Sequence, residues 1–130
     1  MTTIPTTLTE ALDYLDAHTS GADKAYFLSH TDSHFHHGAG TAMRNGFDLW
    51  NPDGALHKWF VAHGFSHPDD MSSVIFKAFR TRLQGGEIDL PKEAAWYKRY
   101  WEESARLGEC GTMSFKVDKD GGLVYPWEET

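Results

Sequence analysis

The chain has 130 residues, 40% of them hydrophobic and 14% aromatic, which suits one folded domain with a single core and argues against a disordered chain. Its formal net charge is −7. A general nucleic-acid-binding protein needs a basic surface to displace counterions from phosphates, so we expect no nucleic acid among the partners.

Cysteine usage and the first residues indicate the compartment. Cys110 is the only cysteine, so the chain can form no internal disulfide, which favours a reducing environment. The segment from Met1 to Pro5 has no basic region and no apolar run that would direct export or membrane insertion. We therefore expect a cytoplasmic protein without membrane contact, located in the host cytoplasm if a phage encodes it.

Short helices are expected at the start of the chain. Thr7 to Glu10 match a capping box, whose side chains satisfy the free amides of a helix start, and apolar residues follow at helical spacing over 8–17. Gly21 to Asp23 should break this helix, and a second short helical stretch should hold Tyr26 and Phe27.

A third helix is expected over 33–47, although three glycines each weaken it by about 1 kcal/mol relative to alanine. Gly38 and Gly40 stand two residues apart, which indicates that a helix or a ligand approaches this backbone closely. Asn51 to Gly54 read as a turn, and a helix over 56–63 follows it.

The clearest helix is expected over 68–83. Pro68 suits a first helical position, and Asp69 and Asp70 favour the positive end of the helix dipole. Core-facing residues then recur at helical spacing: Met71, Val74, Ile75, Ala78, Phe79 and Leu83.

A last helix should begin at Pro91, and after it apolar and polar residues alternate on both sides of Asp118 to Gly122, which predicts a β-hairpin over 112–126. The predicted fold is mainly α: a compact bundle of about five or six helices with a C-terminal β-hairpin. We expect a single domain over 1–130, made of a helical body over 1–107 and the hairpin.

The eight histidines all lie in the first part of the chain. On a continuous helix, His30, His34 and His37 would share one face, where imidazoles can bind zinc with His67 or an aspartate as a fourth ligand. The alternative is a polar, partly solvated helical face. Structural zinc commonly also uses cysteine, and Cys110 lies far from these histidines, so we predict no bound metal; with no phosphate loop or dinucleotide fingerprint, we also predict no cofactor.

A second polar cluster combines Arg44 and Asn45 with Asp69 and Asp70. Arg44 lies two helical turns after His36, so both side chains could face one pocket, where an Arg–carboxylate pair would bind an anionic ligand or prepare a general base. In the structural interpretation, Arg44 instead pairs with Asp69 or Asp70 and ties two helices together.

No catalytic residue is predicted. Ser72 would lie in the first turns of a regular helix, without the strained turn that exposes a nucleophile. Cys110 has no flanking cation to stabilise a thiolate.

Four segments occur in order and at close spacing: His36-His37-Gly38-Ala39-Gly40, Met43-Arg44-Asn45, Leu49-Trp50 and His67-Pro68-Asp69-Asp70-Met71-Ser72. Together they resemble a family of small bacterial and phage proteins known only as a domain of unknown function. Its members read approximately H-F-G-L-G-M-W-I-R-N-N-W-G-L-W and then H-P-D-D-M-S. The likeness extends from the first helix to about Trp101, and it implies a fold and a residue cluster rather than a reaction.

The chain departs from this pattern at three places: His37 stands for an aromatic residue, Thr41 and Ala42 for two bulky apolar residues, and Asp48 for glycine. The predicted residues that contact a ligand or partner are His36, Arg44, Asn45, Trp50, His67, Asp69 and Asp70.

Three functions stay open on the sequence. The first is a non-enzymatic binding or regulatory module that engages another protein, as a phage or mobile-element accessory protein would; its helical body is rich in Trp and Tyr, which are enriched where partners bind. The second is a small ligand-binding protein or enzyme that uses the His/Arg/Asp cluster on a small anionic ligand. The third is a metal protein built on the histidine cluster. We favour the first, with another protein as the partner.

Overall fold

The computed structural model describes residues 4–30, 32–35, 37–108, 116–117 and 123–124. Its helices are α1 (Leu8–His18), α2 (Gly21–Leu28), α3 (Asp32–Phe35), α4 (Ala39–Gly46), α5 (Ala55–Ala62), α6 (Pro68–Leu83) and α7 (Leu90–Gly108). The chain divides into two compact units, Met1–Ala95 and Trp96–Thr130, so that the boundary falls within α7. The expectation of a single domain stays a prediction.

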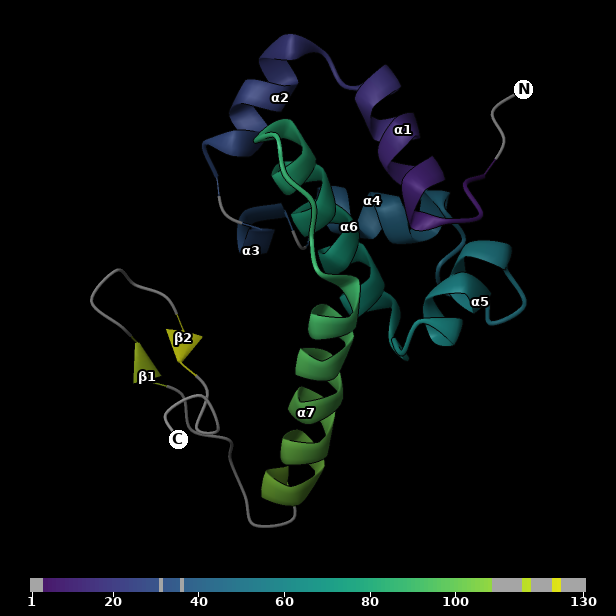
Figure 1. Ribbon diagram of the computed structural model, residues 1–130, viewed down its shortest axis with the longest axis vertical. Helices are drawn as coiled ribbons and strands as arrows, with labels where there is room; N and C mark the ends of the chain where they lie inside the picture. Colours follow the sequence, from purple (N-terminus) through teal and green to yellow (C-terminus); the bar gives the residue numbers. More distant parts are fainter. Residues whose placement is uncertain (1–3, 31, 36, 109–115, 118–122, 125–130) are drawn as a thin grey trace. The chain divides into compact units, whose positions relative to one another are not determined.

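Helix α6 is the centre of the first unit. It packs against each of the five helices that precede it (Figure 1). The predicted core face is confirmed at Met71, Val74, Ile75 and Phe79, all of which are buried, whereas Leu83 in the last turn is half-buried. A helix with neighbours on several sides must be apolar around much of its circumference, which explains why Phe76, outside the predicted stripe, is also buried.

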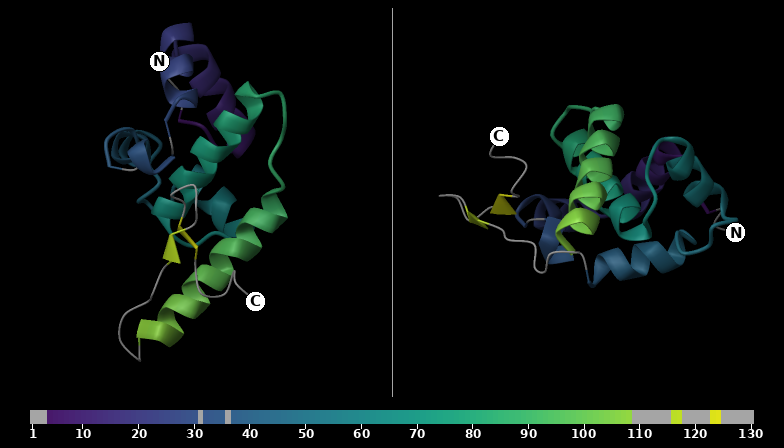
Figure 2. Two further views of the ribbon diagram at one scale, coloured as in Figure 1. Left: turned by 90° about the vertical axis from the view of Figure 1, so that its left-hand side faces the viewer. Right: turned by 90° about the horizontal axis from the view of Figure 1, so that it is seen from below.

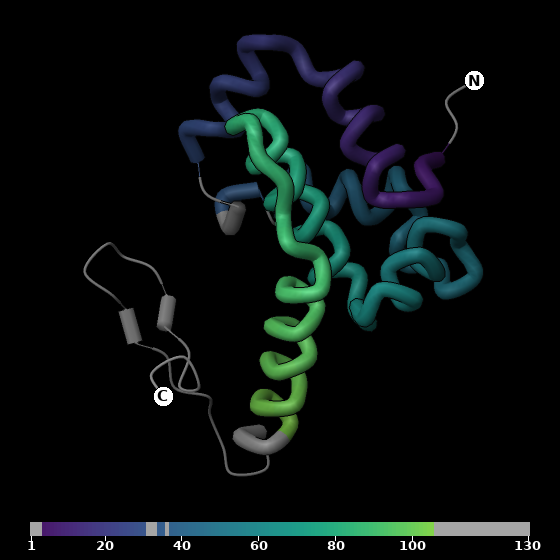
Figure 3. The backbone as a smooth tube through the Cα atoms, in the orientation of Figure 1, coloured from purple at the N-terminus to yellow at the C-terminus, as the bar shows by residue number. Residues whose placement is uncertain are grey.

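Helices α1 and α2 follow one another at one end of this unit (Figures 2 and 3). The hydroxyl of Thr7 accepts a hydrogen bond from the Glu10 amide at 3.2 Å, as the capping box predicts, but the Glu10 carboxylate reaches back to the amide of Thr6 at 3.1 Å. The predicted break after α1 is present, but it lies at Thr19 and Ser20 rather than at Gly21 to Asp23. Ser20 caps α2 by accepting a hydrogen bond from the Asp23 amide at 3.1 Å, so the helix begins at Gly21.

The predicted helix over 33–47 is divided into α3 and α4. A close approach occurs at Gly40, where a Cβ atom would lie 3.0 Å from Nη1 of Arg44 and 3.0 Å from the carbonyl oxygen of Phe35. At Gly38 a Cβ atom would meet nothing within 4 Å. The end of α3 and the side chain of Arg44 are therefore protein groups that approach this backbone closely.

The loop after α4 contains Asp48 at φ 58°, in the left-handed region that favours glycine. The Asp48 carboxylate accepts a hydrogen bond from the Asn51 side chain at 3.0 Å. Aspartate tolerates this conformation better than most residues, and the hydrogen bond offsets part of its cost.

The predicted fold class needs correction at the C-terminus and in the number of helices. Within the predicted hairpin, the structure describes only β1 (Lys116–Val117) and β2 (Leu123–Val124), and two residues in each strand are too few to form the hairpin expected over 112–126. The other residues of that range lie outside the described part. The described residues form seven helices rather than five or six, because 33–47 divides in two. The mainly α character is confirmed.

The second unit begins with the last part of α7. Aromatic side chains recur there: the rings of Trp96 and Tyr100 are stacked with their centroids 5.7 Å apart, and Tyr97 meets Trp96 edge to face at 5.0 Å. No helix in the described ranges has the length and hydropathy needed to cross a bilayer.

Candidate functional site

The predicted polar cluster forms where α4 meets the start of α6. Nε of Arg44 lies 3.4 Å from Oδ1 of Asp69, so the predicted pair is confirmed, with Asp69 as the partner. The two Nη atoms of the guanidinium donate hydrogen bonds, one to the hydroxyl of Ser72 at 2.9 Å and one to that of Thr41 at 3.1 Å. Three groups thus surround a side chain that is only 5% exposed, whereas the Asp69 side chain is 40% exposed.

Gly40 explains how this junction fits together. A side chain there would collide with Arg44 and with the α3 backbone. Three residues therefore belong to a single arrangement: Gly40 leaves the space, Arg44 fills it, and Ser72 accepts a hydrogen bond from the guanidinium. Ser72 donates in turn to the carbonyl oxygen of Asp69 at 3.0 Å, so its hydroxyl is committed to structure.

His67 has a structural role in the same place. Its Nδ1 accepts a hydrogen bond from the Asp69 amide at 3.0 Å, which caps the N-terminus of α6, and Pro68 follows at the first helical position. The ring of Trp50 meets that of His67 edge to face, with centroids 5.9 Å apart. The imidazole thereby links the loop after α4 to the start of α6.

The remaining predicted contact residues are placed differently. Asn45 and Trp50 are exposed, Asp70 is buried in the first turn of α6, and His36 lies outside the described residues. The structure thus brings Arg44, Asp69, His67 and Trp50 to one junction. Their function as ligand or partner contacts stays a prediction.

The histidines near α2 and α3 are engaged with their neighbours. Nδ1 of His30 donates to the carbonyl oxygen of Tyr26 at 2.8 Å, and Nε2 of His34 lies 3.0 Å from the Tyr26 hydroxyl. The two imidazole rings lie 4.5 Å apart, with His30 after α2 and His34 in α3. His37 lies between α3 and α4, so the three histidines do not share the continuous helix that their spacing required. In the described ranges, no three His, Cys, Asp or Glu side chains come together as metal ligands would.

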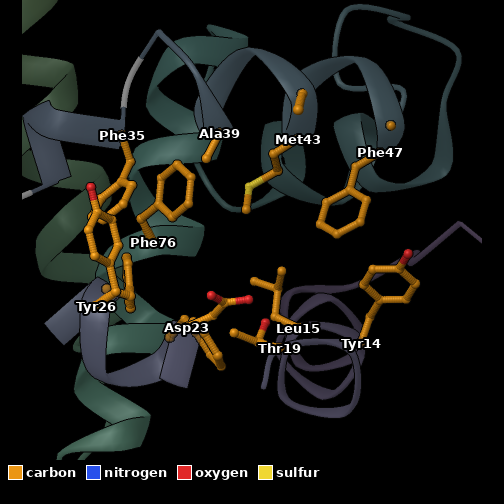
Figure 4. Close-up of a pocket in the computed structure, with 14 residues that line it drawn as sticks. Tyr14, Leu15, Thr19, Asp23, Tyr26, Phe35, Ala39, Met43, Phe47 and Phe76 are labelled. Atoms are coloured by element: carbon orange, nitrogen blue, oxygen red, sulfur yellow. The ribbon is translucent and has the colours of Figure 1, made fainter. Parts of the chain in front are cut away.

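A cavity that no sequence motif marks lies elsewhere in the first unit. Figure 4 shows it between α4 on one side and α1 and α2 on the other, and its volume is about 450 Å³. Its aromatic lining comes from four helices (α1, α2, α3 and α6) and from the residue after α4: Tyr14, Tyr26, Phe27, Phe35, Phe47, Phe76 and Phe79. We call this cavity the aromatic groove.

The walls of the aromatic groove are held by contacts among their own rings. Phe27 packs against Phe35, Phe76 and Phe79 with centroid distances of 5.2, 5.9 and 5.5 Å. The guanidinium of Arg80 lies 4.4 Å from the centroid of Phe27 and also donates to the Phe27 carbonyl oxygen at 3.0 Å. The groove is therefore preformed by packing, which lowers the entropic cost of binding.

One carboxylate belongs to this apolar lining. Asp23, in the first turn of α2, lines the groove, and Figure 4 shows its carboxylate directed into the space between the labelled side chains of α1 and α4. The next residue, Lys24, is committed to Asp16 at 2.7 Å. The hydrogen bond from Lys24 and its positive charge hold the pKa of Asp16 below the ordinary aspartate value.

The groove could not be predicted from the sequence because its lining residues come from separate segments of the chain. Phe79 belongs to the core stripe of α6, Phe76 lies outside that stripe, and Phe47 follows α4. The high aromatic content was the one signal present, and it does not show which rings come together.

The first unit is thus a helical unit that is built on α6 and carries a polar junction and an apolar groove. The chain belongs to the family described as "Domain of unknown function (DUF6794)", which matches residues 4–83. This confirms the expected membership of a family of unknown function. The match ends at the last residue of α6, so α7 lies beyond it. No curated protein and no solved structure matches the chain.

Proposed function

We propose that the protein is a non-enzymatic binding module that holds a helical segment of another protein in the aromatic groove. The observation that supports this proposal is the groove itself, a preformed apolar cavity of about 450 Å³. Cavities of roughly 300–1,000 Å³ with apolar, aromatic walls are typical binding sites. Tyr26 lines the groove and is nevertheless 51% exposed, so it offers an aromatic contact to a partner.

The shape of the groove favours a helical occupant. Its walls are themselves helices, and the α4 wall carries the small residues Ala39, Ala42 and Gly46, which allow another backbone to approach. With eight residues, α4 is about 12 Å long, which corresponds to roughly two turns of a bound helix. A helix laid in such a groove inserts apolar side chains spaced at i, i+3, i+4 and i+7.

The junction at Arg44 is less suited to a small anionic ligand. The guanidinium is buried and already contacts Asp69, Ser72 and Thr41. The exposed charge there is the Asp69 carboxylate, so an approaching anion would meet a negative group first. The expected cytoplasmic location and phage origin stay predictions and do not enter this argument.

A stapled helical peptide tests the proposal. It carries leucine and phenylalanine at i, i+3, i+4 and i+7 on one face and neutral glutamine on the other, and its affinity is measured by fluorescence anisotropy. Ala42→Trp, which fills the groove from the α4 wall, should weaken binding by about tenfold or more. Ala62→Trp, at an exposed position of α5 outside the lining, is the matched control and should leave binding unchanged.

The proposal is wrong if the peptide does not bind the wild-type chain. It is also wrong if Ala42→Trp and Ala62→Trp weaken binding equally, because the peptide would then contact some other surface. Thermal unfolding of both variants, followed by circular dichroism, shows whether a loss of affinity reflects the groove or a loss of fold.

A further inference from the structure

We infer that the helical segment bound by the aromatic groove is basic, with a Lys or Arg beside its apolar anchors that pairs with Asp23. This inference rests on the proposed function and deepens it by assigning the charge of the partner. It is carried by the placement of one carboxylate in an otherwise aromatic lining.

Asp23 differs from the other aspartates of its neighbourhood. Asp16 is paired with Lys24 at 2.7 Å, and Asp13 is paired with Arg82 at 2.9 Å. Among the described side chains, no cation pairs with the Asp23 carboxylate, and the hydrogen bond to the Ser20 hydroxyl uses the backbone amide of Asp23 rather than its carboxylate. A negative charge thus faces the groove without a partner from the described residues.

The lining offers nothing that would attract an acidic occupant. It contains neither lysine nor arginine. Arg80 is bound to the backbone and ring of Phe27 and does not line the groove. An acidic helix would therefore place its carboxylates beside Asp23 with no cation to compensate, whereas a basic helix would gain a charge pair.

The aromatic walls strengthen the same preference. A bound helix removes water from the groove, and a charge pair is stronger where water is excluded than on an open surface. The formal net charge of −7 adds a long-range attraction that speeds the approach of a basic partner.

Three stapled peptides test the inference. All three share the same apolar face and differ at two positions that flank it. The neutral peptide has glutamine at both positions, the second peptide has lysine, and the third has glutamate. At about physiological salt, the lysine peptide should bind the wild-type chain at least about tenfold more tightly than the neutral one, and the glutamate peptide more weakly than the neutral one. Asp23→Asn should remove most of the lysine preference, and Asp23→Lys should transfer the preference to the glutamate peptide.

Asp53→Asn is the matched control, because it changes the net charge by the same amount at an exposed loop position outside the groove. It should keep the lysine preference. If it reduces that preference as much as Asp23→Asn does, the effect comes from overall charge and the inference is wrong. If the three peptides bind equally, and Ala42→Trp weakens all of them, the inference is wrong while the proposed function stands. If none binds, both are wrong.

Discussion

The burial of Arg44 leads to a measurable prediction about the junction between α4 and α6. In Arg44→Lys, a single ammonium group replaces a guanidinium that reaches Ser72, Thr41 and Asp69 from three different nitrogens. A hydrogen bond to a charged group contributes about 1.5–3 kcal/mol. Because lysine can keep only part of these contacts, the free energy of unfolding should fall by about 2–3 kcal/mol.

Substitution of Asp69, the acidic partner, should lower the free energy of unfolding by less than Arg44→Lys does. Removing one member of a fully buried pair costs about 3–5 kcal/mol, but the Asp69 side chain is 40% exposed and water screens its charge. We therefore expect Asp69→Asn to cost about 1–2 kcal/mol. Because the two residues share one interaction, the double variant should be less destabilised than the sum of the two, with a coupling energy of about 1 kcal/mol.

The Arg82–Asp13 pair provides the control for this double-mutant cycle. Its distance of 2.9 Å is shorter than the 3.4 Å of the Arg44–Asp69 pair, but its side chains are 34% and 66% exposed. If burial rather than distance sets the strength, Arg82→Lys and Asp13→Asn should show a coupling below about 0.5 kcal/mol. Urea unfolding of all the variants gives both energies. A coupling at Arg44–Asp69 no larger than that of the control would refute this reasoning.

Three further predictions concern the same unit. Gly40→Ala should lower the free energy of unfolding by about 1–3 kcal/mol, because its Cβ would meet Arg44 and the α3 backbone. Gly46→Ala, where a Cβ meets nothing within 4 Å, should leave the free energy of unfolding unchanged or raise it by up to about 1 kcal/mol. Equal effects of the two substitutions in urea unfolding would contradict the packing described for Gly40. Phe79→Ala should cost about 3–5 kcal/mol, and a loss below about 1 kcal/mol would show that this ring is not part of the core. Lys24→Gln should raise the pKa of Asp16. A carboxyl whose pKa is lowered by folding stabilises the fold at pH values above its pKa in the unfolded chain, so the wild type should lose more stability than the variant as the pH falls below about 4. An unchanged titration of the Asp16 carboxyl by NMR would contradict this.

How much of the site could be predicted depended on the range of the interactions. The Arg44–Asp69 pair was foreseen because a buried arginine needs a carboxylate and the start of α6 offers two of them. The sequence does not predict that Arg44 is buried and Asp69 partly exposed. This difference depends on how closely α3 and α4 approach α6. The break between α3 and α4 was missed although its glycines were noted, since helical spacing alone continued across it.

What the sequence by itself determined is local: the stripe and the proline-initiated start of α6, the Thr7 cap of α1 and the mainly helical class all arise from contacts within about four residues. The aromatic groove was decided only by the tertiary structure, because its lining runs from Tyr14 to Phe79 and comes together only when α6 is covered by the helices before it. The same holds for Asp23, which reads as an ordinary first-turn aspartate of α2. Only packing makes this exposed residue part of the lining of the aromatic groove, because which face of a helix meets its neighbours depends on the whole fold.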